Sequence, residues 1–395
     1  AIHSRSWYST YGRDNQNLHM SAYDTDAAVV GWGASASESW RRVIENDFIA
    51  GEFVWTGFDY LGEPTPWNGI GQGSVSGQGA KPNSSFFGIV DTAGFPKDTY
   101  YLYHSMWNDQ EDTLHLMPTW NKENLVVDNQ GHVKVDVFTN AAKVELYLNG
   151  EKVAEDTSTL HTTDLGYSYR RFTSTNNKKP YATFNIKHEP GKLSVRAWDD
   201  DGNEITKNAF GRKVVETYGE PVALKSSGSK EELTADGRDL LYVEVDVVDE
   251  KGRLVDNATN RVNFEVIGEG KLVGVDNGNQ ADTDSYKGNT RTAFGGKVLA
   301  IIQATNRAGS ITVNVTGEGL EGTSLTINTK AKPSNDVTFL RSYHLADTFY
   351  TQVGQPVALP NVISGTFSNA ENRDIAIEWD EIDQSQYENT GTFEI

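Results

Sequence analysis

The stretch GEFVWTGFDYLGEPTPW, residues 51–67, places aromatic rings beside carboxylates where an apolar segment gives way to a loop with Gly and Pro. The apolar C–H face of a pyranose ring packs on an indole, while the ring hydroxyls need directed hydrogen-bond donors and acceptors. Trp55, Asp59, Glu63 and Trp67 supply both kinds of contact. These residues therefore predict a binding site for a neutral sugar, with Trp55 as the platform for the ring.

The same residues also have a purely structural explanation. Trp55 and Phe58 would then belong to a hydrophobic core, and Asp59 would cap a turn. We expect this explanation to hold for Phe58. For Trp55 the sugar site is favoured, because a Trp at a strand end, followed at once by polar residues and Gly, is poorly placed to serve only as core.

Composition excludes several classes of function. The chain has 395 residues and a formal net charge of −20, from 35 Lys and Arg against 55 Asp and Glu, so a polyanion such as a nucleic acid would meet a repulsive field. Cysteine is absent, which excludes disulfides, thiolate metal sites and Cys nucleophiles. No apolar run approaches the roughly 20 residues that a membrane-spanning helix needs.

Residues 1–119 alternate between helical and strand patterns. The sequence predicts helices over 35–51 and 94–109, and between them two nearly continuous apolar strands, over 52–58 and 86–91. Strands with this pattern are covered on both faces, as in a parallel α/β fold. In (β/α) barrels the functional residues gather at the carboxyl ends of the strands, and Asp59 follows such an end.

After residue 120 the hydrophobic period changes to two. Alternating strands with hairpin turns such as Asn149-Gly150 predict an immunoglobulin-like β-sandwich over 120–216 and a second one over 217–332. A third β unit, residues 333–395, ends at GTFEI without a closing strand. We therefore expect the chain to be cut within a domain.

Two motifs resemble a known family. GEFVWTGFDYLGEPTPW and FFGIVDTAGFPKDTYYLYHSMW closely resemble the last strands and the last helix of the catalytic barrel of glycoside hydrolase family 2, in particular the multidomain bacterial β-galactosidases. The resemblance implies the C-terminal part of a (β/α)8 TIM barrel in residues 1–119, followed by immunoglobulin-like β-sandwich domains. Residues 333–395 resemble a truncated bacterial immunoglobulin-like repeat, which is typical of enzymes that are secreted or attached to the bacterial cell surface.

The resemblance also implies a chemistry. Members of this family hydrolyse glycosides with retention, using an acid/base Glu and a nucleophilic Glu about 5–5.5 Å apart. The opening AIHSR resembles the tail of the nucleophile motif, so both Glu residues are expected upstream of Ala1 and no catalytic residue is assigned in this chain. His3 would lie beside the nucleophile. We expect the chain alone to be inactive and to need the N-terminal remainder of the barrel as a partner.

One motif bears on the sugar. Members that cleave glucuronides carry Asn-x-Lys just before the Gly-Ile of the last strand, where the Lys meets the sugar carboxylate. This chain has Ser85, Phe86 and Phe87 there. A carboxylate beside Phe87 would be desolvated without compensation, whereas a neutral hexose suits it. The resemblance thus favours a retaining exo-β-galactosidase, acting on terminal β-galactosides of oligosaccharides or glycans, over a glucuronidase, and it leaves a mannoside open.

No cofactor or metal site is assigned. The acidic stretch DNGNQADTDSYK, residues 276–287, lacks the spacing of a calcium loop, and turn formation explains it better. Family members use Mg²⁺ or Na⁺, but the resemblance places no ligands for either ion here. The alternative to an enzyme fragment is a carbohydrate-binding or cell-surface adhesion module built from the β-sandwiches.

Overall fold

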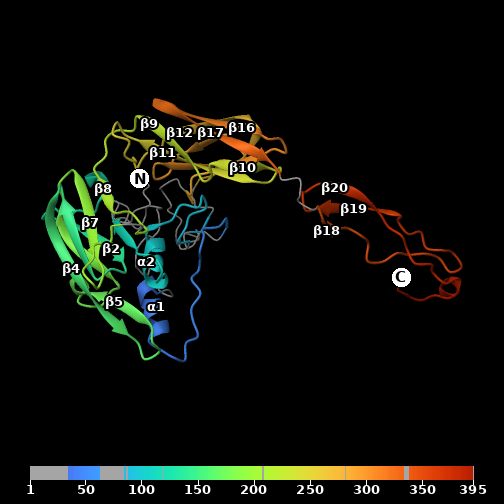
Figure 1. Ribbon diagram of the computed structural model, residues 1–395, viewed down its shortest axis with the longest axis horizontal. Helices are drawn as coiled ribbons and strands as arrows, with labels where there is room; N and C mark the ends of the chain where they lie inside the picture. Colours follow the sequence, from blue (N-terminus) through green and yellow to red (C-terminus); the bar gives the residue numbers. More distant parts are fainter. Residues whose placement is uncertain are drawn as a thin grey trace, which may run out of the picture.

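A computed structural model of the chain describes residues 34–62, 84–85, 88–117, 119–206, 209–280, 282–332 and 338–394. Two β-rich bodies lie on either side of a segment with two helices, and a narrow C-terminal part extends away from them (Figure 1). Among the described residues, no helix is both long and apolar enough to cross a membrane.

The two helices of the N-terminal segment are shorter than predicted. Helix α1 covers Ala36–Ile44, where Arg41 forms ion pairs with Glu38 and Glu45. Helix α2 covers Asp98–Trp107. It begins four residues later than expected, because Gly94 and Phe95 belong to a turn closed by backbone hydrogen bonds to Asp91.

The two predicted strands of this segment pair in parallel, as expected, but only over a short stretch. Phe58 and Val90 form an isolated parallel bridge. The amide of Asp59 donates to the carbonyl of Val90 at 2.9 Å, and the amide of Val90 donates to the carbonyl of Gly57 at 3.0 Å. The described residues therefore contain one parallel contact of the α/β kind but no closed barrel, so the TIM barrel stays a prediction.

Within the described part of the chain, residues 52–58 are covered on one face and not, as predicted, on both. Val54 packs against the hydrophobic core that α2 shares with the first β-sandwich, but Phe53 and Trp55 are exposed. Phe58, expected in the core, is 61% exposed. The reason is that, in the described part of the chain, only the face of this segment that carries Val54 packs against another element.

The first β-sandwich has two sheets, with strand orders β1-β2-β6 and β5-β4-β3-β7-β8. Its strands are β1 (Leu114–Met117), β2 (His132–Thr139), β3 (Lys143–Leu148), β4 (Glu151–Thr162), β5 (Ser168–Phe172), β6 (Tyr181–Lys187), β7 (Lys192–Trp198) and β8 (Val214–Glu216). Two short 3-10 turns, Lys122–Asn124 and Thr173–Thr175, connect them. Strand β1 pairs with β2, so the sandwich includes residues before 120.

The alternating pattern of the sequence gives this sandwich its core. Val133, Val135 and Val137 of β2 are fully buried, because every second side chain of a strand points to the same face. The predicted hairpin turn is confirmed: Asn149 and Gly150 join β3 to β4 with φ values of 51° and 92°, as a tight turn of primed type requires.

The second sandwich forms a larger, continuous set of strands. They are β9 (Ala223–Gly228), β10 (Glu232–Ala235), β11 (Leu240–Val248), β12 (Arg261–Gly268), β13 (Gly270–Asp276), β14 (Thr290–Thr292), β15 (Lys297–Ala304), β16 (Gly309–Gly317) and β17 (Leu320–Ala331). Their order is β13-β15-β11-β9-β17-β16-β12-β14, with β10 beside β17. Val243, Val262 and Val313 lie in its own core, so it is a separate packing unit.

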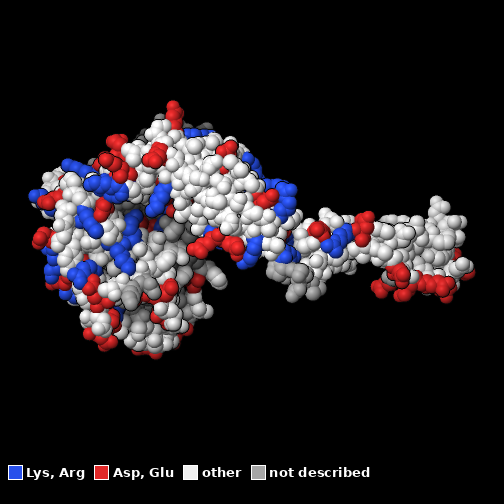
Figure 2. Space-filling model, turned by 45° about the horizontal axis from the view of Figure 1, so that its top comes forward, with Lys and Arg blue, Asp and Glu red and all other residues white. Residues whose placement is uncertain are grey.

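The C-terminal part has one small sheet, in the order β18-β19-β20. The strands are β18 (Leu340–Tyr343), β19 (Val362–Phe367) and β20 (Asn372–Ala376), followed by a 3-10 turn at Gln384–Tyr387. A hydrogen bond of 2.8 Å from Arg238 to the carbonyl of Ser368 ties it to the second sandwich. Acidic side chains line one edge of this part, whereas charges of both signs are mixed over the sandwiches (Figure 2).

Candidate functional site

Trp55 stands at the surface with its indole edge anchored. The residue is 69% exposed, and its Nε1–H donates to the hydroxyl of Tyr60 at 3.2 Å. The two rings meet edge to face, with centroids 6.4 Å apart and an interplanar angle of 86°. An indole held by its edge leaves ring surface open, which is the arrangement that stacking against a sugar requires. The role of Trp55 as a sugar platform stays a prediction.

Tyr60 is fixed by the backbone of the neighbouring segment. Its amide donates to the Ser85 hydroxyl at 3.1 Å, and the Ser85 amide donates to the Tyr60 carbonyl at 2.8 Å. Leu61 and Ser84 form an antiparallel bridge directly beside this pair. The backbone amide and carbonyl of the tyrosine that binds Trp55 are therefore both fixed by hydrogen bonds to Ser85.

Asp59 is buried, at 5% exposure, and its carboxylate is surrounded by donors. Oδ1 accepts from the Gly88 amide at 2.8 Å. Oδ2 accepts from Lys97 Nζ and from Gln280 Nε2, both at 2.9 Å. Burial raises the pKa of Asp59, and the fully buried Lys97 ammonium opposes that rise. The carboxylate joins three parts of the chain, and its predicted contact with a sugar stays a prediction.

A second aspartate, Asp91, ends the neighbouring strand segment. Its Oδ1 accepts from the amides of Ala93 and Phe95, both at 3.0 Å, which shapes the turn before α2. Gly278 of the second sandwich lies against this carboxylate: a Cβ at that position would come within 2.1 Å of Asp91 Oδ2. Its φ of +73° also favours glycine. The second sandwich thus reaches the strand ends at two points.

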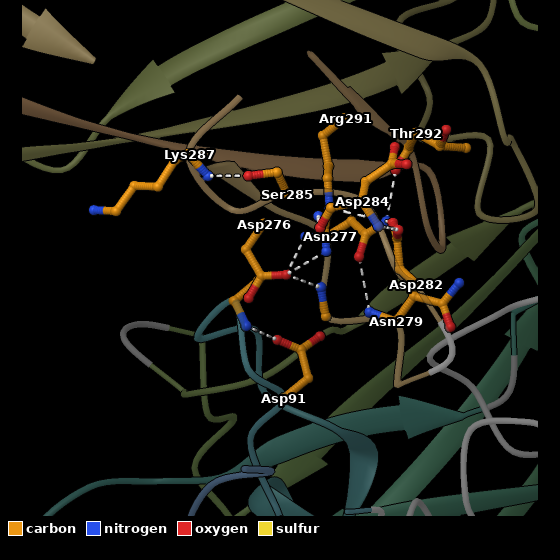
Figure 3. Close-up of polar contacts among 12 residues, drawn as sticks. Asp91, Asp276, Asn277, Asn279, Asp282, Asp284, Ser285, Lys287, Arg291 and Thr292 are labelled. Atoms are coloured by element: carbon orange, nitrogen blue, oxygen red, sulfur yellow. Dashed lines mark hydrogen bonds and ion pairs between the residues drawn. The ribbon is translucent and has the colours of Figure 1, made fainter. Parts of the chain in front are cut away.

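The loop that makes these contacts is organised around a buried arginine (Figure 3). Arg291 is fully buried and lies 3.4 Å from Asp276 and 3.2 Å from Asp282. Asn277 donates to Asp282 at 2.6 Å and to the carbonyl of Thr292 at 2.8 Å. The acidic residues of 276–287 are therefore used in turns and ion pairs, which agrees with the explanation by turn formation.

No metal centre emerges from the described part of the chain. Within it, no group of three or more His, Asp or Glu side chains is arranged to hold an ion. The acidic loop already carries the guanidinium of Arg291 at its centre, and this cation takes up the charge that would attract a metal.

A separate cavity of 390 Å³ lies where α2 and both sandwiches meet. His115 Nε2 lies 2.6 Å from Asp98 within it, and burial lowers the pKa of His115, which favours the neutral imidazole. Lys297 pairs with Glu244 and Asp246 at its edge. His115 thus pairs between β1 and α2, and Lys297 pairs with the neighbouring strand β11 of its own sandwich, so these groups already have partners and the cavity is a weaker candidate than the surface around Trp55.

Four of the predicted site residues, His3, Glu63, Trp67 and Phe87, lie outside the described residues. Their roles stay predictions. The structure adds two residues that sequence reasoning missed, Lys97 and Gln280. Neither has a local signal, because Gln280 is separated from Asp59 by 221 positions and Lys97 is a single basic residue at the start of a helix.

Three family models match parts of the chain. Residues 224–326 match "Glycoside hydrolase family 2 C-terminal domain 5", which covers most of the second sandwich. Residues 130–206 match a domain of unknown function, DUF4982, within the first sandwich. Residues 346–395 match "Bacterial Ig-like domain (group 4)".

Curated relatives carry the names of two glycosidase activities. The chain is 38% identical over 305 residues to beta-galactosidase BoGH2A of Bacteroides ovatus, covering 76% of this chain and 31% of the relative. It is 28% identical over 312 residues to a putative beta-glucuronidase of Formosa agariphila, covering 77% of this chain and 25% of the relative. The chain thus spans about a third or less of the length of these relatives.

Solved structures of similar proteins agree with the fold. A beta-glycosidase from Bacteroides vulgatus matches with a TM-score of 0.60 and 26% identity, over 77% of this chain and 34% of that one. A glycosyl hydrolase family 2 member from Bacteroides cellulosilyticus matches with a TM-score of 0.57 and 24% identity, over 74% of this chain and 37% of that one. At this identity the second match supports the fold alone.

Proposed function

Because the chain belongs to the multidomain proteins of glycoside hydrolase family 2, we propose that it is part of a retaining exo-β-galactosidase. The enzyme would act on terminal β-galactosides of oligosaccharides or glycans. The observation that carries the proposal is the exposed indole of Trp55, anchored through Tyr60 at the ends of two segments that pair in parallel. This chain would supply the floor of the sugar site.

The choice of galactoside rests on the residues that precede Gly88. A glucuronide needs a cation for its carboxylate, and the segment Ser85-Phe86-Phe87 offers none. Ser85, the described member, uses its hydroxyl to accept from the Tyr60 amide. The 38% identical relative is named a beta-galactosidase, which also supports this choice.

The two catalytic Glu residues are proposed to lie upstream of this chain. Among the described Glu residues of the N-terminal segment, three near its start already have partners: Glu38 and Glu45 pair with Arg41, and Glu52 accepts from the Ser39 hydroxyl. None of these three belongs to the anchored surface around Trp55 and Tyr60.

A set of exposed apolar side chains supports a partner for this segment. It comprises Phe48, Phe53, Trp55, Phe58 and Leu61, all of them exposed. Exposed apolar side chains are costly in water, at about 25 cal/mol for each Å² of apolar surface. We propose that the N-terminal remainder of the barrel covers most of it and leaves the face of Trp55 open to the sugar.

We also propose that the parent protein is secreted or displayed on a bacterial cell surface, which the match to the bacterial Ig-like domain supports. The alternative function, a carbohydrate-binding or adhesion module, has less support from the described residues. Exposed aromatic side chains of the β units, such as Tyr167, Tyr242 and Tyr350, lie in three different parts of the chain. Binding of residues 113–395, which keep strand β1 of the first sandwich, to a glycan array would favour that alternative.

The test is a substrate panel on the full-length parent protein that contains this chain. We expect turnover of nitrophenyl β-galactoside with a kcat/KM at least about tenfold above those for the matched β-glucuronide and β-mannoside. A preference for the glucuronide or the mannoside would overturn the choice of sugar. The absence of turnover with all three glycosides would overturn the proposed activity.

A further inference from the structure

The second sandwich contacts the strand ends through the loop between β13 and β14, of which residues 277–280 and 282–289 are described. Gln280 of this loop is buried, at 2% exposure, and its amide nitrogen donates to Asp59 Oδ2 at 2.9 Å. Two residues earlier, Gly278 lies against the Asp91 carboxylate. One loop of an accessory domain therefore meets both aspartates at the ends of the parallel segments.

The loop is held rigidly enough to position what it contacts. Asp276 Oδ1 accepts from the amides of Asn277 at 2.7 Å and Gly278 at 3.2 Å. The Asn279 amide donates to Asn277 at 2.9 Å, and Arg291 donates to the Asp284 carbonyl at 2.7 Å. Gln280 thus projects from a loop whose backbone is fixed on both sides.

Gln280 is not the only contact between the two parts. Ala93, Phe95 and Leu299 form an apolar cluster between the turn before α2 and strand β15, with Ile301 packed against it. Lys297 lies over the Phe95 ring at 5.3 Å. Because apolar contacts also join the two parts, the hydrogen bond from the Gln280 amide to Asp59 can serve to position Asp59 as well as to hold the parts together.

A short chain of contacts leads from Gln280 to the platform. Gln280 donates to Asp59, and the next residue, Tyr60, accepts the indole N–H of Trp55. The Asp59 amide also donates to the Val90 carbonyl, so a shift of Asp59 changes the alignment of the two segments. The Asp59 carboxylate is therefore linked, through the backbone and Tyr60, to the residue that anchors the indole.

We propose that Gln280 is a positioning residue for the sugar platform: through Asp59 and Tyr60, the second sandwich sets the orientation of Trp55. This inference rests on the proposed function, because it assigns the second sandwich a part in that same sugar site. It makes this accessory domain a component of substrate binding rather than a spacer.

The kinetic test uses Gln280→Leu and Gln280→Glu in the full-length parent. We expect Gln280→Leu to lower kcat/KM about tenfold, mainly through a higher KM, at every pH. Gln280→Glu places a second carboxylate beside Asp59, so its defect should be large at neutral pH. The defect should shrink in acid, where a protonated Glu donates to Asp59 as the amide does.

The matched control is Gln303→Leu, which removes a similar hydrogen bond, 2.8 Å from Gln303 Nε2 to the Gly237 carbonyl, within the same sandwich. This variant should keep the parental KM. A parental KM for Gln280→Leu would overturn the proposal. So would a Gln280→Glu defect that does not change with pH.

A second measurement needs no activity, so it separates this inference from the proposed function. Hydrogen exchange on the 395-residue chain should show lost protection at 55–61 and 88–97 in Gln280→Leu, and no change there in Gln303→Leu. If the parent cleaves no galactoside but these segments respond as expected, the substrate is wrong and the coupling stands. Unchanged exchange in both segments would overturn the coupling whatever the parent cleaves.

Discussion

At the scale of single residues, the decisive feature is the contrast between Trp55 and Asp59. The two lie four positions apart, but one is exposed and the other buried. The indole keeps ring surface for a ligand, while the carboxylate holds the backbone beneath it through Gly88 and Lys97. Trp55 thus offers aromatic surface to a ligand, and Asp59 uses its charge to position the backbone.

The first prediction concerns Trp55→Ala in the parent protein. Loss of the platform should lower kcat/KM for a galactoside by 10- to 100-fold, which corresponds to about 1.4–2.7 kcal/mol of transition-state binding. The melting temperature should change little, because the side chain is exposed and packs mainly against Tyr60. Kinetics and thermal unfolding of the same sample check both statements.

The control for that prediction is Trp107→Ala. Trp107 is also exposed, but it lies on α2 against Tyr103, with ring centroids 4.6 Å apart. Its removal should leave kcat/KM unchanged. Equal losses of activity in the two variants would show that Trp55 has no special role in binding.

A second residue-scale prediction concerns acid stability. The ion pair with Lys143 and the hydrogen bond from Tyr147 lower the pKa of the buried Glu145 from 4.5 to about 2. A carboxyl whose pKa is lowered in the folded state stabilises the fold above pH 4.5, and this contribution is lost as the pH falls toward 2. Glu145→Gln should therefore cost about 1 kcal/mol at pH 7 and roughly half of that or less at pH 3.

Urea unfolding of the chain at pH 7 and pH 3 measures this difference. Glu151→Gln is the control, because Glu151 is exposed at the start of β4 in the same sandwich. Its effect should be small at both pH values. A cost of Glu145→Gln that is the same at pH 7 and pH 3 would contradict the assignment.

At the scale of elements, the β13–β14 loop has the most consequence. It belongs to a sandwich with a core of its own, but its backbone lies against the aspartate that ends another domain's strand segment. The acidic residues that resemble a calcium loop in sequence are instead neutralised by Arg291. A loop stabilised from within can present a fixed surface to a neighbouring domain.

The matched substitutions Gly278→Ala and Gly252→Ala test this contact. The two glycines have φ values of +73° and +74°, so the backbone strain of an added Cβ is the same. At Gly252 the Cβ would meet nothing within 4 Å, whereas at Gly278 it would meet Asp91. Gly278→Ala should therefore be the more destabilising by about 1–3 kcal/mol.

Thermal and urea unfolding of the two variants give the comparison. The extra loss in Gly278→Ala should be accompanied by faster hydrogen exchange around Asp91. Equal destabilisation by the two substitutions would mean that the loop does not press on that carboxylate in solution.

At the scale of the whole molecule, the N-terminal segment lies between two self-contained sandwiches. Its helices share a core with the first sandwich, and its strand ends are bound to the second. The exposed group from Phe48 to Leu61 has no such cover in the described part of the chain. The two sandwiches thus hold a segment whose apolar surface is available to a further partner.

The last prediction follows from this arrangement. The purified 395-residue chain should hydrolyse no nitrophenyl β-galactoside, because the catalytic Glu pair is expected upstream of it. Native mass spectrometry should detect a complex when the N-terminal remainder of the barrel is co-expressed, and that complex should regain turnover. Robust turnover by the chain alone would contradict the absence of catalytic residues.

The sequence by itself determined the features that depend on near neighbours. Alternation in 133–148 produced the buried face of β2 and β3, and Asn149-Gly150 produced the turn between β3 and β4, because strand period and turn conformation are local properties. The motif around Trp55 indicated a surface aromatic for the same reason: the polar and Gly residues after it leave little to bury it.

Only the tertiary structure decided which side chains meet across domains. Phe58 is a large apolar residue of the kind found in cores, but it is exposed because no described element packs against it. Asp59 is predicted from its motif to contact the sugar, and the structure shows its carboxylate bound to Lys97 and Gln280. Gln280 lies 221 positions away in the chain. Such contacts depend on how separately folded units dock, and no periodicity in the chain encodes that.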